Sequence, residues 1–492
     1  MKRHFLFFLL LIIMVGLRPF PATAAPQATI VVNSLADDQT VNGNCTLREA
    51  LLAAEINFAW DGCAAGSANE PDLIVFAVSG VIHMTLGQFV ITSPVIIRGN
   101  GRGETIIDAN DKSRIFQAEA PLKLESLTLQ NGHAISGGAA IQGYFSSSPP
   151  YLLELDNVVI QDSNSTGGNG GAIEVAFWDL TIKNSLLQRN SAALRGGAIF
   201  MLNTNAIIED SIVRENNTAD IGGGIRGNRG ALTITRTLIE GNNSSNHAGG
   251  LYYGLGYFSL TDSAIRNNVA ETGNGGGISF LDVYTLIEGS TISGNSARQG
   301  NGGGIRFRGS FDDVPQFLMT NSTVSGNTAF WGGGLYLDPT GDTAPTIYHT
   351  TIADNTALSG LGAGGAIFLD PDSNPVSLTR SIISGNSGFP TCYPIGALNS
   401  AGFSLLQDNA CGSHTTDLVG VDPLLAPLAA NGGPTETHAL QPDSPAIDVA
   451  DCVTGIVVDQ RGVMRPQGER CDSGAFEFED LAVYLPLIVR SQ

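Results

Sequence analysis

The chain has 492 residues, including 61 glycines, and its 46 acidic against 25 basic side chains give a formal net charge of −21. A hydrophobic content of 42% excludes wholesale disorder, and the glycines do not recur at every third position as they do in collagen. So acidic a chain repels nucleic-acid backbones, anionic lipids and anionic glycans unless a divalent cation bridges, and we expect no nucleic-acid partner.

The first 24 residues have the pattern of a secretory signal peptide. Lys2 and Arg3 precede an apolar run over residues 5–17, and Ala22-Thr23-Ala24 supplies a small-residue cleavage site. The run has 13 residues, against the roughly 20 that span a bilayer, so we predict cleavage after Ala24 and no transmembrane span afterwards. The protein is expected to be secreted, either extracellular or displayed on the cell surface.

Six cysteines fall into three close pairs along the chain. Their number is even and the predicted compartment is oxidising, so disulfides are favoured over a zinc site, which would need C-x2-C or nearby histidines. Because each cysteine has a neighbour 18 or 19 residues away, we predict three local bonds: Cys45–Cys63, Cys392–Cys411 and Cys452–Cys471.

A short helix is predicted just after Cys45. Thr46 and Glu49 form a capping box, and Leu47, Ala50, Leu51 and Ala54 follow at helical spacing. We interpret this helix as the lid that closes the N-terminal end of a repetitive fold. Strand-like runs between residues 73 and 129 form the first irregular coils.

Two signatures alternate through the middle of the chain. One is a glycine pair or triplet followed by an aliphatic residue, as in Gly170-Gly-Ala-Ile173 and Gly222-Gly-Gly-Ile225; the other is aliphatic-x-x-Asn, ending at Asn190, Asn216 and later equivalents. Both recur every 26 to 32 residues. Short runs of period two between Gly, Asn and Ser clusters indicate stacked coils of β-strand.

This repeat predicts an all-β fold, a right-handed parallel β-helix (solenoid) of about ten coils with a short N-terminal capping helix. The glycines are expected to adopt positive φ at sharp bends, and the aliphatic residues to stack as one interior column. The asparagines are expected at turns, in the left-handed conformation, with their amides stacked in a hydrogen-bonded ladder. We assign both signatures to structure and not to chemistry.

Three segments resemble known modules of exported bacterial proteins. Residues 44–55, NCTLREALLAAE, resemble the CSLREA module, with Thr46 in the usual Ser position; residues 431–477, with NGGPTETH, SPAID, DQRG and CDSGAFE, resemble the choice-of-anchor Q-type module. The middle repeats are similar to those of polymorphic outer-membrane proteins, with Ile, Val or Leu replacing a Phe. The resemblance implies a secreted, pectin lyase-like β-helix, usually without an assigned activity, and it carries over no catalytic residue.

The predicted organisation follows the chain: 1–24 signal peptide, 25–130 N-terminal cap with the CSLREA-like motif and first coils, 131–390 β-helix repeats, 391–478 disulfide-containing C-terminal module, and 479–492 a short apolar tail. The tail contains Pro486 and is either a sorting signal or a last strand.

The residue after each repeated aliphatic position is expected to point outward. That column contains four aromatic residues and two arginines, which we predict to contact a ligand: Phe200, Arg226, Tyr252, Arg306, Tyr336 and Phe368. The expected partner is a polysaccharide or a cell-surface protein.

No sequence pattern identifies a catalytic site. Acidic clusters in the longer coils are interpreted as solvated turns. Calcium is the one candidate cofactor, with these candidate ligands: Asp338, Asp342, Asp370 and Asp372. We therefore favour a non-catalytic structural, adhesion or carbohydrate-contacting role, with no other cofactor. The alternative is a polysaccharide lyase or glycoside hydrolase acting in a groove of the β-helix.

Overall fold

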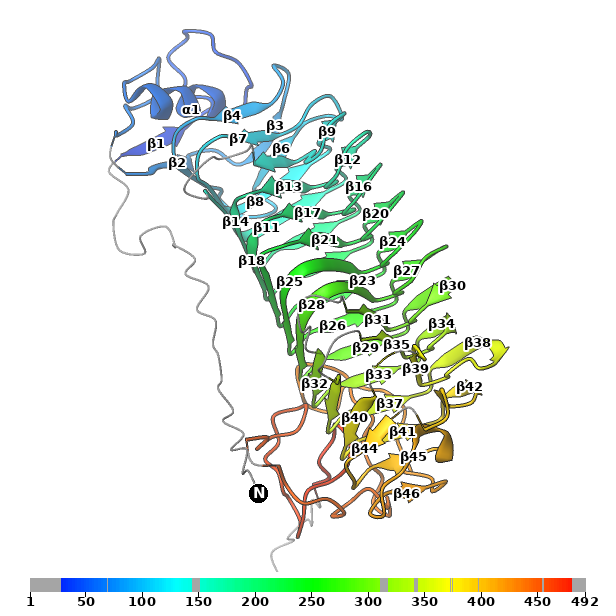
Figure 1. Cartoon of the computed structure of the whole chain (residues 1–492). Helices are drawn as coiled ribbons and strands as arrows, with labels where there is room; N and C mark the ends of the chain where they lie inside the picture. Colours follow the sequence, from blue (N-terminus) through cyan, green and yellow to red (C-terminus); the bar gives the residue numbers. More distant parts are fainter. Residues whose placement is uncertain are drawn as a thin grey trace, which may run out of the picture.

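The computed structural model describes residues 28–68, 70–143, 151–309, 317–339, 344–371, 373, 375–396, 398–453 and 455–479. The predicted signal peptide, almost all of the apolar tail, Asp342 and Asp372 lie outside these ranges. Within them the chain is a right-handed parallel β-helix of about 12 turns, drawn in Figure 1 as a rod of stacked coils. The predicted fold class is confirmed, with two more turns than the repeat count indicated.

Each regular coil carries four short strands, each in register with the equivalent strand of the next coil. The first face of the rod bears the ladder strands: β4 (Phe89–Ile91), β7 (Phe116–Ala118), β10 (Ile141–Gly143), β13 (Ile173–Ala176), β17 (Ile199–Leu202), β21 (Ile225–Asn228), β25 (Leu251–Thr261), β28 (Ile278–Glu288), β31 (Ile305–Arg308), β35 (Leu335–Asp338), β39 (Ile367–Leu369) and β43 (Cys392–Tyr393).

Strands of the second face follow after a corner; the long β25 and β28 continue from the first face onto this one, and β8 and β11 continue onto the third. The second-face strands are: β1 (Thr29–Val32), β2 (Asp72–Phe76), β5 (Val95–Arg98), β8 (Leu122–Gln130), β11 (Leu152–Gln161), β14 (Asp179–Lys183), β18 (Asn205–Glu209), β22 (Ala231–Thr235), β32 (Phe317–Thr320), β36 (Thr346–Tyr348), β40 (Val376–Thr379) and β44 (Leu398–Ser400).

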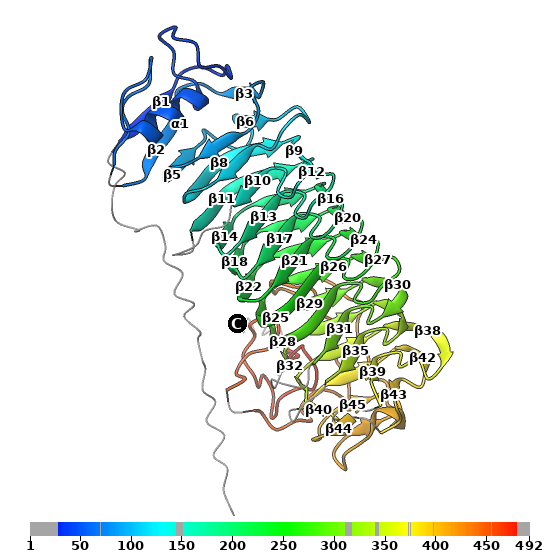
Figure 2. The same cartoon turned by 45° about the horizontal axis from the view of Figure 1, so that its top comes forward.

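The third face consists of short strands: β3 (Gly80–His83), β6 (Thr105–Asp108), β15 (Leu186–Gln188), β19 (Ile212–Arg214), β23 (Leu238–Glu240), β26 (Ala264–Arg266), β29 (Thr291–Ser293), β33 (Thr323–Ser325), β37 (Thr351–Ala353), β41 (Ile382–Ser384), β45 (Leu405–Leu406) and β46 (Leu418–Val419). A separate sheet beside the ladder strands, visible in Figure 2, completes each coil: β9 (His133–Ala134), β12 (Asn164–Ser165), β16 (Ser191–Ala192), β20 (Asn217–Thr218), β24 (Asn243–Ser244), β27 (Val269–Ala270), β30 (Ser296–Asn301), β34 (Thr328–Trp331), β38 (Thr356–Leu361) and β42 (Ser387–Phe389).

The glycine signature has two separate backbone functions. The first residue of each group, such as Gly170 or Gly196, has positive φ, as predicted. The second, such as Gly171, has no room for a side chain, because a Cβ there would lie 2.1 Å from the carbonyl oxygen of Gly197 in the next coil. The aliphatic residue after the group is fully buried, as at Ile173, and these residues form the predicted interior column.

The repeated asparagines form the predicted ladder, but not in the predicted conformation. Asn242 Nδ2 donates to Asn268 Oδ1 over 2.9 Å, and Asn268 Nδ2 donates to Asn295 Oδ1 over 3.0 Å. The left-handed residue is the one before each asparagine, for example Asn267 with φ of 56°. The prediction of left-handed asparagines is therefore wrong: the turn is made one position earlier, so that the amide can point along the rod axis.

The N-terminal end of the rod is closed by α1 (Leu47–Ile56), as predicted (Figure 1). Thr46 is its N-cap and makes the expected capping box with Glu49. Leu47 and Ala50 are fully buried in the main core. Arg48 binds Asp37, with Nε 2.6 Å from Oδ1, and also donates to the carbonyl oxygens of neighbouring loops, which fastens the helix to the first coils.

The three predicted disulfides are present, at Cys45–Cys63, Cys392–Cys411 and Cys452–Cys471. The second encloses the 3-10 helix η1 (Asn409–Cys411). Within the described ranges, no helix is both long and apolar enough to cross a membrane.

After β46 the chain turns back and lies against the third face of the last coils, as Figure 1 shows. Threonines in equivalent positions of this face bind the returning segment: Thr291 Oγ1 donates to the Glu436 carbonyl over 2.5 Å, and Thr323 Oγ1 donates to Gln460 Oε1 over 2.7 Å. On earlier coils the same register position is held by Leu238 and Ile212, which are half-buried. The polar threonines thus coincide with the covered part of the face.

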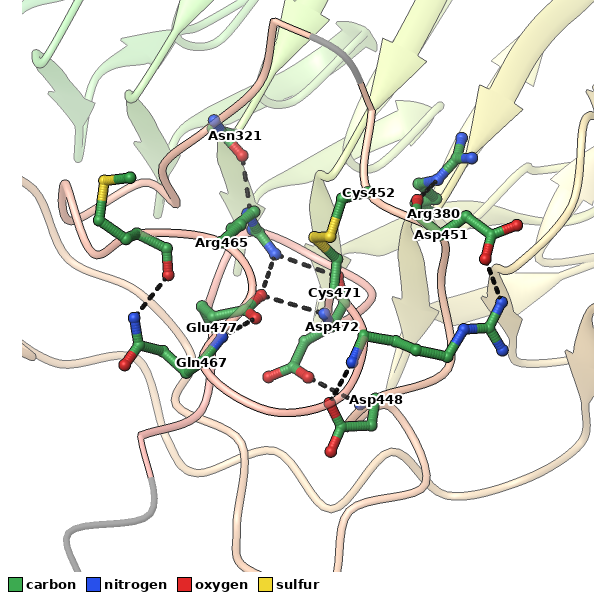
Figure 3. The surroundings of a disulfide bond; sticks show 12 residues. Asn321, Arg380, Asp448, Asp451, Cys452, Arg465, Gln467, Cys471, Asp472 and Glu477 are labelled. Atoms are coloured by element: carbon green, nitrogen blue, oxygen red, sulfur yellow. Dashed lines mark hydrogen bonds and ion pairs between the residues drawn. A yellow bond between two sulfur atoms is a disulfide. The ribbon is translucent and has the colours of Figure 1, made fainter.

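A buried ionic network holds the returning segment together (Figure 3). Arg465 Nη1 lies 2.7 Å from Glu477 Oε2, and both side chains are fully buried. Arg465 also donates to the Asp472 and Gly474 carbonyls, and the same Glu477 oxygen accepts from the Asp472 backbone. These residues lie in the region from DQRG to CDSGAFE, so charged side chains of this region stabilise the fold of the returning segment.

Candidate binding site

The outward positions of the ladder strands line up along the rod, in the register predicted from the sequence. Glu174 pairs with Phe200, and the register continues through Arg226 to Tyr252 and onward. We call the following set the outer column: Phe200, Arg226, Tyr252, Ser279, Arg306, Tyr336, Phe368 and Tyr393. All six predicted ligand-contacting residues therefore lie in one column, with Ser279 between Tyr252 and Arg306.

At its C-terminal end the outer column stacks three aromatic rings face to face along the rod. Tyr336 and Phe368 are stacked with centroids 4.8 Å apart and planes at 6°, and Phe368 and Tyr393 follow at 5.0 Å. Trp331, from β34 of the neighbouring sheet, also stacks on Phe368 at 5.8 Å. Phe200 and Phe368 are buried, at 8% and 7% exposed, whereas Tyr252, Tyr336 and Tyr393 remain partly exposed.

Tyr393 and Trp331 were not identified from the sequence. Tyr393 follows Cys392, which occupies the aliphatic position in register with Ile367 but lacks the preceding glycine pair. The sequence signal that could have identified Tyr393 is the cysteine before it, which takes the interior aliphatic position of the repeat. Trp331 precedes the glycines of its coil and reaches the column from the side, which no period-two pattern predicts.

Arg226 sits between two rings of the outer column. Its Cζ lies 5.5 Å from the Phe200 centroid and 5.4 Å from the Tyr252 centroid, a double cation–π contact. Burial lowers the pKa of Arg226, and likewise that of Arg306 three coils further on. Burial also raises the pKa of Tyr252.

The outer column carries acids beside it at its C-terminal end. Arg308 Nε lies 3.5 Å from Asp338 Oδ2, and the Tyr336 hydroxyl donates to Asp370 Oδ2 over 3.4 Å. Burial and then the charge of Asp370 raise the pKa of Asp338, while burial and both carboxylates raise the pKa of Tyr336 to about 12. These residues form an acidic group at one end of the column.

The structure places two of the four candidate calcium ligands, Asp338 and Asp370, in this acidic group. The other two, Asp342 and Asp372, are not among the described residues. Across the described ranges, no group of three or more His, Cys, Asp or Glu side chains is arranged to hold a metal ion.

A match to a family model agrees with the fold. The model described as "Right handed beta helix region" matches residues 258–410. Among solved structures the chain is similar to one titled "Crystal structure of pectate lyase Pel9A", with a TM-score of 0.42 and 13% identity over 92% of this chain and 97% of that chain. No curated protein matches the chain.

Proposed function

We propose that this protein is a secreted or surface-displayed β-helical rod that binds a polymeric ligand, a polysaccharide, along the outer column without altering it chemically. The observation that carries this proposal is the outer column itself, with eight residues in register on consecutive coils. At about 4.8 Å per coil the column extends roughly 34 Å, which suits a chain lying parallel to the rod. Three disulfides favour an oxidising, extracellular setting.

Recognition through the outer column depends on hydrogen bonding at its edge. The tyrosine hydroxyls and the guanidinium N–H groups that are not enclosed can bind sugar hydroxyls, whereas the faces of the Tyr336, Phe368 and Tyr393 rings pack on one another. This differs from stacking of sugars on exposed ring faces, and it makes the hydroxyls of Tyr252 and Tyr336 the groups of interest.

The test is a triple substitution, Tyr252→Ala with Tyr336→Ala and Phe368→Ala, assayed for retention on immobilised polysaccharides and on cell surfaces. We expect retention to fall at least about tenfold, the effect of a few lost hydrogen bonds. A matched control removes three exposed aromatic residues elsewhere, Phe177, Tyr257 and Tyr284. Equal retention by both variants and the parent would overturn the proposal.

A second candidate function, polysaccharide cleavage, is favoured by the acidic group. Asp338 and Asp370 are neighbouring carboxyl groups beside Arg306 and Tyr336, and Asp338 has a raised pKa. Such pairs serve as acid and base in glycoside hydrolysis. New reducing or unsaturated ends from a polysaccharide panel, with or without calcium, and their loss in Asp338→Asn, would establish this activity in place of simple binding.

A further inference from the structure

Arg226 is a buried cation without a counter-ion. It is 8% exposed, its Nε and Nη1 are enclosed without a hydrogen-bond partner, and its contacts are the Phe200 and Tyr252 rings. Asp220, the acid whose charge acts on Arg226, is paired with Arg195 at 3.3 Å. Arg306 is partly exposed, and its Nε is also enclosed without a hydrogen-bond partner; it forms no ion pair with any described residue, although the charge of Asp338 acts on it.

Several other arginines in the described part of this acidic protein are ion-paired even where water can solvate them. Arg98 binds Glu125 at 2.5 Å and Arg298 binds Glu271 at 2.8 Å, although both side chains are more than half exposed and gain little from pairing. Removing a guanidinium from water without a partner is unfavourable, so an unpaired arginine is least expected where it is most buried. An external anion bound at Arg226 Nη2, the guanidinium nitrogen that is not enclosed, would offset part of this cost.

We propose that Arg226 and Arg306 bind the anionic groups of an acidic polysaccharide, carboxylate or sulfate, which rests on the polysaccharide-binding function proposed above. The two residues lie three coils apart, about 14 Å along the rod. Between them the outer column holds only Tyr252 and Ser279 and no acid. A ligand with charges repeated along an extended chain can engage both guanidiniums at once.

The net charge of −21 does not prevent this contact. Charges separated by more than about 8 Å are largely screened at physiological ionic strength, so the residues at the contact decide its sign. The acidic group with Asp338 and Asp370 lies beyond Arg306. It repels an anionic chain, so the ligand extends from Arg306 toward Phe200.

Binding is measured with three immobilised polymers in the presence of a chelator: alginate, which carries carboxylates, dextran sulfate, and uncharged dextran. The variants are Arg226→Met and Arg306→Met, which keep an unbranched apolar stem, and the control is Arg98→Met, which removes the same charge from the second face. We expect Arg226→Met and Arg306→Met each to lose at least about tenfold in affinity for whichever acidic polymer the parent binds. Binding of that polymer by the parent should weaken as the salt concentration rises.

Melting temperature separates a binding role from a packing role. Because neither guanidinium has an ion-pair or hydrogen-bond partner among the residues that the structure describes, the methionine variants should melt no lower than the parent; if the arginines instead hold the coils together, the variants should melt lower. Preference for alginate identifies carboxylate and preference for dextran sulfate identifies sulfate as the bound group. Parental binding to dextran alone, or unchanged acidic binding in both variants, overturns this inference; absence of binding to every polymer overturns the proposed function as well.

Discussion

Ala248 is a residue in a backbone position that otherwise holds glycine. It has φ of 57° and is fully buried, where the neighbouring coils have Gly222 and Gly275 at φ of 76° and 73°. A Cβ in the left-handed region costs about 1–2 kcal/mol, and the greater unfolded-state freedom of glycine offsets part of that. The repeat therefore carries local strain at this coil.

Ala248→Gly should stabilise the protein by about 0.5–1 kcal/mol, because it removes the strained Cβ without disturbing the interior column. Chemical denaturation measures the change. Ala172→Gly is the control, since Ala172 is also buried in the glycine signature but does not have positive φ, and it should destabilise. Equal effects of the two substitutions would contradict this explanation.

Single asparagines of the ladder each join three coils. Asn268 accepts from the Asn242 side chain and backbone and donates to the Ile239 carbonyl and to Asn295, all within the buried interior. No apolar residue can satisfy these groups. The hydrogen bonds of the ladder thus keep equivalent positions of successive coils aligned.

Asn268→Ala should lower the free energy of unfolding by about 2–4 kcal/mol, because it leaves buried donors and acceptors of two neighbouring coils without partners. Thermal and urea unfolding measure the loss. Asn217→Ala, at an exposed position, should change stability by less than about 0.5 kcal/mol. If Asn268→Ala is as mild as its control, water or a neighbouring side chain must replace the lost bonds.

Among the elements, the returning C-terminal segment is the one whose stability depends most directly on protonation. Asp472 accepts from the Asp448 and Phe478 backbones, but burial dominates and raises the pKa of its carboxyl from 3.8 to about 7. Between these values the folded protein keeps a proton that the unfolded chain has lost. The contribution of Asp472 to stability is therefore complete at low pH and decreases as pH rises toward 7.

Asp472→Asn should consequently flatten the pH dependence of stability between about pH 4 and 7, compared with the parent. Melting temperatures of the variant and the parent at pH 5 and pH 8 give the comparison. Burial lowers the pKa of His349, but this histidine is present in both proteins, so its effect on the melting temperature cancels in the comparison. The control is Asp451→Asn, at an exposed carboxylate paired with Arg470. A parallel shift of both melting curves across this range would show that Asp472 does not titrate there.

The extent of successful prediction differed between interior and exterior. Glycine spacing, the asparagine ladder, the capping box and the disulfides follow from local backbone requirements, which a repeated sequence expresses in every coil. The C-terminal segment after β46 packs on Thr291 and Thr323 through contacts between residues more than 100 positions apart in the sequence. Such contacts leave no periodic pattern from which they could be predicted. In the outer column the sequence predicts which residues point outward, but ring orientation is decided by packing between coils.

For the molecule as a whole, the remaining physical problem is the end of the rod, where strand edges and interior side chains would meet water. At the N-terminal end α1 covers this edge, with Leu47 fully buried and Ile56 at the last position 43% exposed. An uncovered end is a template for pairing with another coil. The cap should therefore keep the rods apart in solution.

Leu47→Asp should detach α1, since a carboxylate cannot be accommodated in the core, and should produce concentration-dependent end-to-end association of rods. Sedimentation velocity at several protein concentrations detects this association, and small-angle scattering distinguishes lengthened rods from irregular aggregates. Ile56→Asp, on the same helix but solvent-facing, should sediment as the parent does. A Leu47→Asp protein whose sedimentation is independent of concentration would show that the first coils protect their own edge and that α1 serves another purpose.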